Sequence, residues 1–348
     1  MLFLFHPGTV TSIDGGALYA RRAPAFVKAV TLFVLPLAFA GPLAAATYVL
    51  NDPHTALIGT PGADAAQAED TLLDVARRNG LGYEEIVRVN PGVDTWLPGA
   101  GRKLVLPTQR IIPDVEHDGI VVNLPEHRLY YFPKLKRGAA PTVITYPVSI
   151  GRMDWATPIG LTQIAAKNRN PVWYPPKAVL DEHEANGDPL PAVVPAGPDN
   201  PLGAYAMRLA IPGGAYLIHG TNKPAGVGMQ VTHGCMRLYP EDIEALFPLV
   251  PLRTPVRIIN EPVKLGWVGD ELYMEAYRPL DRMGDPEEPD LKILEDMLLK
   301  ATADRPVAIN WDLARATLKE ARGMPIVVAI EVVSEVDPSL PPAATPQP

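Results

Sequence analysis

The sequence predicts a mainly β protein: a β-rich body with one or two helices, which follows a small helical module and precedes a helical appendage. From Gly119 onward, apolar and polar residues alternate in short runs, as they do in strands that bury one face. Forty prolines are spread along 348 residues, and this density disfavours long helices. The length suggests two domains.

The first 46 residues have the organisation of a secretory signal peptide. Basic residues up to Lys28 precede an uncharged run, Ala29 to Leu50, which contains the small residues Ala44–Ala46. We therefore predict a signal peptide over 1–46. The uncharged run is also long enough to span a membrane, so an uncleaved anchor is the alternative. In both cases the rest of the chain is expected in the periplasm.

Charge and cysteine content narrow the function. The net charge is −8, and loss of residues 1–46, with three basic residues and one acidic residue, would bring it to −10. Such a chain lacks the basic face that binds nucleic acid, and we expect no nucleic-acid partner. Cys235 is the single cysteine, so no disulfide can form within the chain. A lone thiol in an oxidising compartment indicates a residue kept for its reactivity.

Two short helices are predicted ahead of the β-rich body. Residues 47–67 have no apolar periodicity, and we predict a linker there. In 68–110, the apolar residues are spaced for one face of a helix in two successive runs. Gly80 is expected to end the first helix, and Asn90–Pro91 the second. A short strand, "KLVLP", closes this module. Its core must be very small because the module has only about 45 residues.

The β-rich body is predicted over 118–262. The stretch "GIVVNLPEHRLYYF" predicts a hairpin with a turn at Pro-Glu-His. Further strands are predicted over 141–151, 204–211, 215–220 and 254–260. The stretch "PEDIEALFPLV" predicts a helix, because Pro240 suits the first helical position and two acids follow it.

Three segments follow the body. Residues 263–280 are predicted to extend it by a strand, "GDELYMEAY". A C-terminal appendage, 281–336, contains two amphipathic helices and a strand-like run, "MPIVVAIEVVSEV". Residues 337–348 predict a disordered tail. The appendage carries no functional motif.

Cys235 lies in a setting that can activate a thiol. His219 precedes it by sixteen residues, at the end of a predicted strand, with the glycine-rich "GTNKPAGVGM" between them. A nearby imidazole, or a helix N-terminus such as the one near Pro240, lowers the pKa of a thiol, so we expect a low pKa here. Gly234 allows close approach of a substrate, and the amides of Gly234 and Cys235 are candidates for an oxyanion hole.

Further candidate site residues flank the thiol. His233 is expected to point the same way as Cys235, as a second polarising group, a substrate contact or a structural residue. Arg237 is either a group that binds a substrate carboxylate or an ordinary surface arginine. A metal site of His219, His233 and Cys235 has suitable ligand types but lacks a fourth ligand and the usual spacing. We predict no metal and no cofactor.

The residues around the thiol resemble the signature of the L,D-transpeptidase (YkuD) family. His219–Gly220 and "THGCMR" at Thr232–Arg237 carry the resemblance, with Thr232 in place of the more usual serine. Supporting segments are "TPIG" at 157–160, "NPVWYPP" at 170–176, and residues 188–209 and 238–251. The resemblance runs from residue 119 to 275. It implies a YkuD-like β-sandwich or barrel, with Thr232 near the substrate.

The module over 68–110 resembles a LysM domain, which has a small α+β (βααβ) fold. The matching residues are Asp70–Leu72, Ala76, Glu85–Ile86, Asn90–Pro91, Leu97–Gly99 and Leu104–Pro107. LysM domains bind glycans that contain N-acetylglucosamine, such as peptidoglycan. The resemblance therefore implies a glycan-strand partner and a tether that raises the local substrate concentration. On this basis its deletion should leave activity on small soluble muropeptides intact.

Together the resemblances imply an acyltransferase of the cell wall. His219, oriented by the Gly220 carbonyl, would take the proton of Cys235, which attacks the bond between meso-diaminopimelate and D-alanine in a tetrapeptide stem. The thioester would pass to an amine, either of another stem, giving a 3→3 cross-link, or of an envelope lipoprotein. The alternatives are an L,D-carboxypeptidase, in which water accepts the acyl group, and a non-catalytic peptidoglycan-binding envelope protein.

Overall fold

The computed structural model describes residues 46–50, 56–135, 137–213, 216–280 and 291–332. The predicted signal peptide, 1–46, lies outside these residues except for Ala46, and so does the predicted tail, 337–348. In the ranges that are described, no helix is long and apolar enough to cross a membrane.

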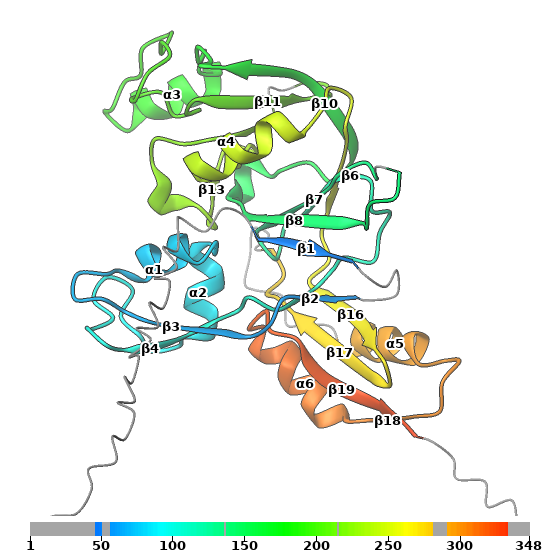
Figure 1. Ribbon diagram of the computed structural model, residues 1–348. Helices are drawn as coiled ribbons and strands as arrows, with labels where there is room; N and C mark the ends of the chain where they lie inside the picture. Colours follow the sequence, from blue (N-terminus) through cyan, green and yellow to red (C-terminus); the bar gives the residue numbers. More distant parts are fainter. Residues whose placement is uncertain (1–45, 51–55, 136, 214–215, 281–290, 333–348) are drawn as a thin grey trace, which may run out of the picture. The chain divides into compact units, whose positions relative to one another are not determined.

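A nine-stranded sheet forms the centre of the β-rich body (Figure 1). Its order is β1-β8-β7-β6-β15-β10-β11-β12-β14, in which the β6–β15 and β12–β14 pairs are parallel and the others antiparallel. The strands are β1 (Thr47–Val49), β6 (Gly119–Asn123), β7 (Arg128–Phe132), β8 (Thr142–Pro147), β10 (Gly160–Arg169), β11 (Tyr205–Leu209), β12 (Leu217–His219), β14 (Met236–Arg237) and β15 (Pro255–Ile259). The mainly β prediction is confirmed.

Both faces of this sheet are covered near its centre. Along β6, Ile120 and Val122 join the main hydrophobic core, while Val121 joins a smaller core with Ile58. Successive residues of a strand point to opposite faces, so β6 separates the two cores. The predicted hairpin is present, because β6 pairs with β7 in antiparallel register.

Two helices belong to the body. The predicted helix is α4 (Pro240–Leu249), which buries Ile243, Leu246 and Phe247 in the main core. The second helix is α3 (Lys177–Ala185). The prediction allowed for one or two helices in the body but did not locate this one. Short elements complete this region: β9 (Ile150–Gly151), η1 (Met153–Trp155), η2 (Pro224–Gly226) and β13 (Gln230–Thr232).

The predicted module has the βααβ arrangement, and we call these four elements the N-terminal module. They are β3 (Gly62–Ala65), α1 (Leu72–Arg78), α2 (Tyr83–Val89) and β4 (Lys103–Leu106), with β3 antiparallel to β4. Thr71 and Asp74 form a reciprocal capping box at the start of α1, which supplies partners for its first N–H groups. The module has a core of its own around Leu72, Leu81 and Ile86.

The linker predicted over 47–67 is wrong for the described part of that stretch. β1, β2 (Leu57–Ile58) and β3 all lie there. Their partners are distant in sequence, since β1 pairs with β8 and β2 pairs with β5 (Arg110–Ile111). Strands this short have no periodicity of their own, and only the partner strand defines them.

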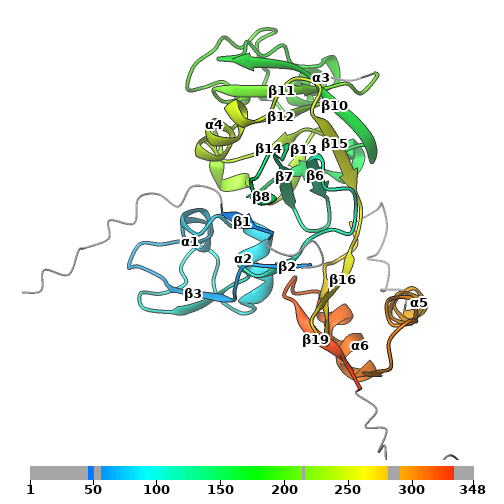
Figure 2. The same cartoon turned by 45° about the vertical axis from the view of Figure 1, so that its right-hand side comes forward.

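The strand extension and the C-terminal appendage form one sheet rather than two segments. It has the order β16-β17-β19-β18, with α5 and α6 beside it (Figure 2). The elements are β16 (Val263–Val268), β17 (Glu271–Ala276), α5 (Leu291–Ala301), β18 (Val307–Ile309), α6 (Trp311–Glu320) and β19 (Ile326–Glu331). The two predicted helices and the later strand are confirmed, and β17 pairs with β19 instead of packing on the body alone.

Candidate active site

Two neighbouring parallel strands bring the candidate residues together. β12 ends at His219, and β14 begins one residue after Cys235. The register pairs His219 with Arg237, so their side chains share one face of the sheet. The guanidinium of Arg237 shifts the pKa of both His219 and Cys235. The imidazole, the thiol and the guanidinium therefore belong to one site.

His219 is held as a neutral imidazole. Its Nδ1 lies 2.6 Å from the carbonyl oxygen of Gly220, the contact that the family resemblance implied. A carbonyl can only accept, so Nδ1 carries the proton and the lone pair of the neutral ring lies on Nε2. Burial, followed by the charge of Arg237, lowers the pKa of His219 to about 3. The ring is therefore unprotonated at neutral pH, and burial together with the charge of Arg237 disfavours its protonated form.

Cys235 is half-buried, and its pKa differs from the expectation. Burial raises the pKa of the thiol, while a backbone hydrogen bond to Leu217 and the charge of Arg237 act in the opposite direction without outweighing it. The expected low pKa is therefore wrong for this state. The free-energy cost of desolvating the thiolate exceeds the stabilisation that these two contacts give it. The resting site combines a neutral thiol with a neutral imidazole.

Arg237 is not an ordinary surface arginine. Burial lowers the pKa of its guanidinium. Its Nε is buried, and among the described residues this atom has no hydrogen-bond partner. In the same part of the chain no carboxylate lies within the 4.0 Å of an ion pair with it. A buried guanidinium that lacks a carboxylate beside a thiol is suited to bind an anionic substrate group.

The backbone around the thiol is fixed from both sides. Gly234 has a φ of +91°, and a Cβ there would lie 2.8 Å from Cε1 of Tyr216, so only glycine fits. Oγ1 of Thr157 donates to the Gly234 carbonyl at 3.1 Å. Oγ1 of Thr232 donates to the Cys235 carbonyl at 2.5 Å. The hydroxyl kept at Thr232 therefore shapes the turn that presents the thiol.

His233 contacts a carboxylate that the sequence analysis missed. Its Nε2 lies 2.8 Å from Oε2 of Glu182, on α3. Arg152 donates to both carboxylate oxygens of Glu182 at 2.7 Å, and Trp155 meets the His233 ring edge-on. The hydrogen bonds from Arg152 and then His233 lower the pKa of Glu182 to about 2, so it is ionised at neutral pH. α3 is thus joined to the segment that carries the thiol.

The sequence did contain a signal for α3. Pro175–Pro176 precede the helix and Asn186–Gly187 follow it, and both pairs are typical of helix limits. Its few apolar residues hid the periodicity. A metal site gains no support, since the described residues contain no group of three or more His, Cys, Asp or Glu side chains that could hold an ion.

The fold and the site define a cysteine-containing transferase with a β-rich catalytic domain. Residues 117–258 match the model of the YkuD L,D-transpeptidase catalytic domain. The chain is 42% identical over 261 residues to probable L,D-transpeptidase YbiS of Escherichia coli K12, covering 73% of this chain and 83% of that protein. It is 36% identical over 306 residues to probable L,D-transpeptidase YcfS of the same strain, covering 87% and 94%. The chain belongs to the L,D-transpeptidase family, which acts on peptidoglycan.

Solved structures include similar proteins. An L,D-transpeptidase from Mycobacterium smegmatis matches with a TM-score of 0.31 and 18% identity, over 46% of this chain and 64% of that chain.

Proposed function

We propose that this L,D-transpeptidase uses Cys235 as a nucleophile on the bond between meso-diaminopimelate and D-alanine in a tetrapeptide stem. One observation carries the proposal: a single thiol shares a site with a neutral imidazole whose Nδ1 faces the Gly220 carbonyl and with a guanidinium that has no carboxylate partner in the described ranges. These groups supply the nucleophile, the base and the anion site that acyl transfer from a peptide with a free carboxylate requires.

The proton must move as the sulfur attacks, because the resting thiol and imidazole are both neutral. Sγ of Cys235 bonds to the carbonyl carbon while its proton passes to Nε2 of His219. The amides of Gly234 and Cys235 stabilise the oxyanion. The C–N bond then breaks, D-alanine leaves as an amine with the proton from His219, and a thioester remains.

An amine resolves the thioester in the second half of the reaction. Its nitrogen attacks the thioester carbonyl, its proton passes to His219, and the proton returns to the sulfur as the C–S bond breaks. The acceptor is the side-chain amine of another diaminopimelate, which gives a 3→3 cross-link, or a lysine of an envelope lipoprotein. Water in place of the amine would make the enzyme an L,D-carboxypeptidase.

Arg237 binds the carboxylate of the terminal D-alanine in this scheme. A bidentate guanidinium–carboxylate pair holds the scissile bond against Cys235 and compensates the buried charge. Since that carboxylate leaves with D-alanine, the site is then free for the acceptor. The same charge favours the thiolate as it forms.

The N-terminal module is proposed to bind the glycan strand, and the leader to place the enzyme in the periplasm. Trp96 and Leu97 are 67% and 69% exposed on the loop before β4. Asp94 accepts hydrogen bonds from both of their amides, at 2.8 and 3.0 Å, so the loop is ordered. An exposed aromatic face on an ordered loop suits the apolar face of a sugar ring.

Intact-mass spectrometry of the protein incubated with a disaccharide-tetrapeptide tests the function. A mass gain equal to the substrate minus D-alanine, absent in Cys235→Ala, is expected. Added amine should then be found in the product. D-alanine release that persists in Cys235→Ala would refute the nucleophile. Release without transfer to any amine would favour the carboxypeptidase, and binding to sacculi without an adduct would favour a non-catalytic binding protein.

A further inference from the structure

The N-terminal module makes backbone contacts with a segment next to the active site. This segment, Pro224–Met229, lies between β12 and β13, and we call it the 224–229 segment. The amide of Tyr83 donates to the carbonyl of Val227 at 3.0 Å, and the amide of Glu84 donates to the carbonyl of Gly228 at 3.3 Å. The first N–H groups of a helix have no hydrogen-bond partner within the helix. In α2, two of these N–H groups bond to carbonyl groups of the 224–229 segment.

The two backbones meet at two glycines, where neither residue has space for a Cβ atom. A Cβ on Gly82 would lie 2.7 Å from Cα of Gly228, and a Cβ on Gly228 would lie 2.5 Å from Cα of Gly82. Gly228 also has a φ of +84°. Because no side chain separates the two backbones, a displacement of α2 is passed on to the 224–229 segment.

The same segment borders the residue that is proposed to bind the substrate carboxylate. Oγ of Ser149 donates to the Gly226 carbonyl at 2.7 Å, and Ser149 exchanges two backbone hydrogen bonds with Arg237, at 2.9 and 3.1 Å. A Cβ at Gly226 would lie 3.7 Å from Nη1 of Arg237. The 224–229 segment is therefore held between α2 on one side and Ser149 and Arg237 on the other.

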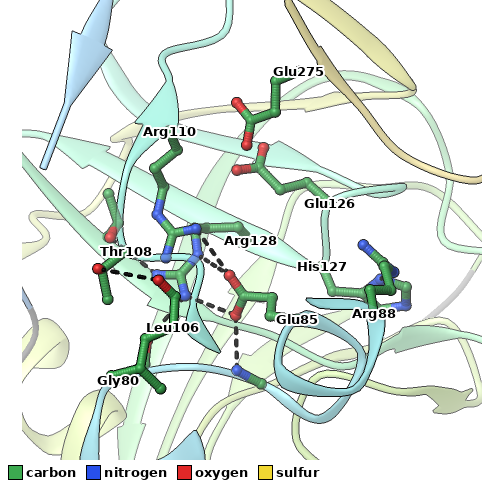
Figure 3. A network of polar contacts seen from close by, with 12 residues as sticks. Gly80, Glu85, Arg88, Leu106, Thr108, Arg110, Glu126, His127, Arg128 and Glu275 are labelled. Carbon is green, nitrogen blue, oxygen red and sulfur yellow. Dashed lines mark hydrogen bonds and ion pairs between the residues drawn. The ribbon is translucent and has the colours of Figure 1, made fainter. Parts of the chain in front are cut away.

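α2 is itself fixed to the catalytic sheet by a buried ion cluster (Figure 3). Glu85, at the third position of α2, accepts hydrogen bonds from Nε and Nη2 of Arg128 at 2.9 and 2.7 Å, and from Nη1 of Arg110 at 2.9 Å. Arg128 belongs to β7 and is 1% exposed. The hydroxyl of Tyr239, just before α4, donates to the Leu81 carbonyl at 3.1 Å.

We propose that the N-terminal module is a positioning element of the catalytic site, acting through the contact of α2 with the 224–229 segment. This inference rests on the proposed function, since it needs an acylation rate to measure. The module then contributes to turnover of substrates that carry no glycan polymer. This proposal differs from the expectation that deletion of the module leaves activity on small soluble muropeptides intact.

Two substitutions at one position separate the backbone contact from the side chain. Tyr83→Pro removes the N–H that bonds Val227, at the first helical position, where proline is well tolerated. Gly82 before it has φ −94° and ψ 171°, which suits a residue ahead of proline. Tyr83→Ala removes the side chain and keeps the N–H, so it is the matched control.

The readout is the rate of acyl-enzyme formation per folded molecule, with kcat and KM, on a soluble disaccharide-tetrapeptide. Tyr83→Pro is expected to lower the acylation rate and kcat by about tenfold to a hundredfold, as displacements near 1 Å do, with a smaller change in KM. Tyr83→Ala should stay within about threefold of the wild type. Equal rates in both variants, or equal losses, would overturn the proposal.

A second pair of variants tests the proposal independently, in case Tyr83→Pro fails to fold. Gly82→Ala introduces the clash with Gly228, while Gly266→Ala introduces a clash of 2.5 Å with Cβ of Ala56, away from the 224–229 segment. We expect both to lower the melting temperature and only Gly82→Ala to slow acylation. If both slow it alike, the effect is general destabilisation and the proposal fails. A wild type that forms no acyl-enzyme would instead refute the proposed function.

Discussion

Glu85→Gln tests how strongly the N-terminal module is joined to the catalytic sheet. The carboxylate is buried and accepts four N–H bonds, two from Arg128 and one each from Arg110 and Gly82. Burial acts to raise the pKa of Glu85, but the charges of Arg128 and Arg110 outweigh it and the pKa is lowered. The group is therefore an anion that compensates two buried guanidinium groups.

The amide keeps the size of the side chain and removes the charge. Loss of one partner from a buried ion pair costs about 3–5 kcal/mol, because the remaining charge has neither water nor a counter-ion. With a urea dependence of about 2–3 kcal/mol per M, the unfolding midpoint should fall by about 1–2 M. The matched control is Glu84→Gln on the same helix, whose ion pair with Arg88 is long, at 3.7 Å, and partly exposed. It should cost less than about 1 kcal/mol.

Urea unfolding followed by far-UV circular dichroism and by tryptophan fluorescence measures both variants. Arg110→Met in the Glu85→Gln background removes one of the uncompensated cations, so the double variant should be more stable than the sum of the single changes. The electrostatic account is refuted if Glu85→Gln and Glu84→Gln shift the midpoint equally, or if the two changes are simply additive.

Three further predictions concern the site and the pH dependence. Glu182→Gln should lower kcat on the order of tenfold by releasing the ring of His233, whereas Asp181→Asn on the same helix should not; steady-state kinetics on a soluble tetrapeptide checks this. Because burial raises its pKa, the thiol of Cys235 should react with iodoacetamide with a midpoint at higher pH than free cysteine, and a midpoint below that of free cysteine would contradict the buried resting state. Burial and then Arg88 lower the pKa of His127 to about 3, so the unfolded chain takes up a proton below pH 6.5 that the folded chain does not, and stability falls as the pH falls. In His127→Asn the loss of unfolding free energy between pH 7 and pH 5 should be smaller by about 2 kcal/mol, as measured by denaturation at both pH values.

The sequence was sufficient to predict those helices and strands whose own residues show a clear apolar periodicity. The β6–β7 hairpin, α4, the two helices of the N-terminal module and α5 and α6 follow from apolar periodicity and from residues typical of helix ends. The pairing of His219 with the region of Cys235 follows from the motif, and the parallel β12–β14 pair accounts for it.

What the sequence could not predict depends on partners that are remote in the chain. β1 has three residues and exists because β8 offers a free edge about a hundred positions later. Glu182 meets His233 across 51 positions, and Glu85 meets Arg128 across 43. Glu85 and Glu182 lie on helices and are of the charged type that is usually solvent-exposed, so the sequence gives no sign of these contacts. The pKa of Cys235 was mispredicted for a related reason, because desolvation depends on the packing around the thiol and not on its neighbours in sequence.

The order of strands in the large sheet has a consequence for how the chain folds and for the export that we propose for it. The central pair joins Ile120 to Val256, and the first edge pair joins Thr47 to Ile144. The sheet cannot close until nearly all of its residues have left the ribosome, and pairings over such separations form slowly. A chain that crosses a membrane through a narrow channel must stay unfolded on the near side. Under the proposed periplasmic location, late strand closure leaves time for that passage, so a circular permutant in which β6 and β15 were adjacent in sequence should fold faster and be exported less well.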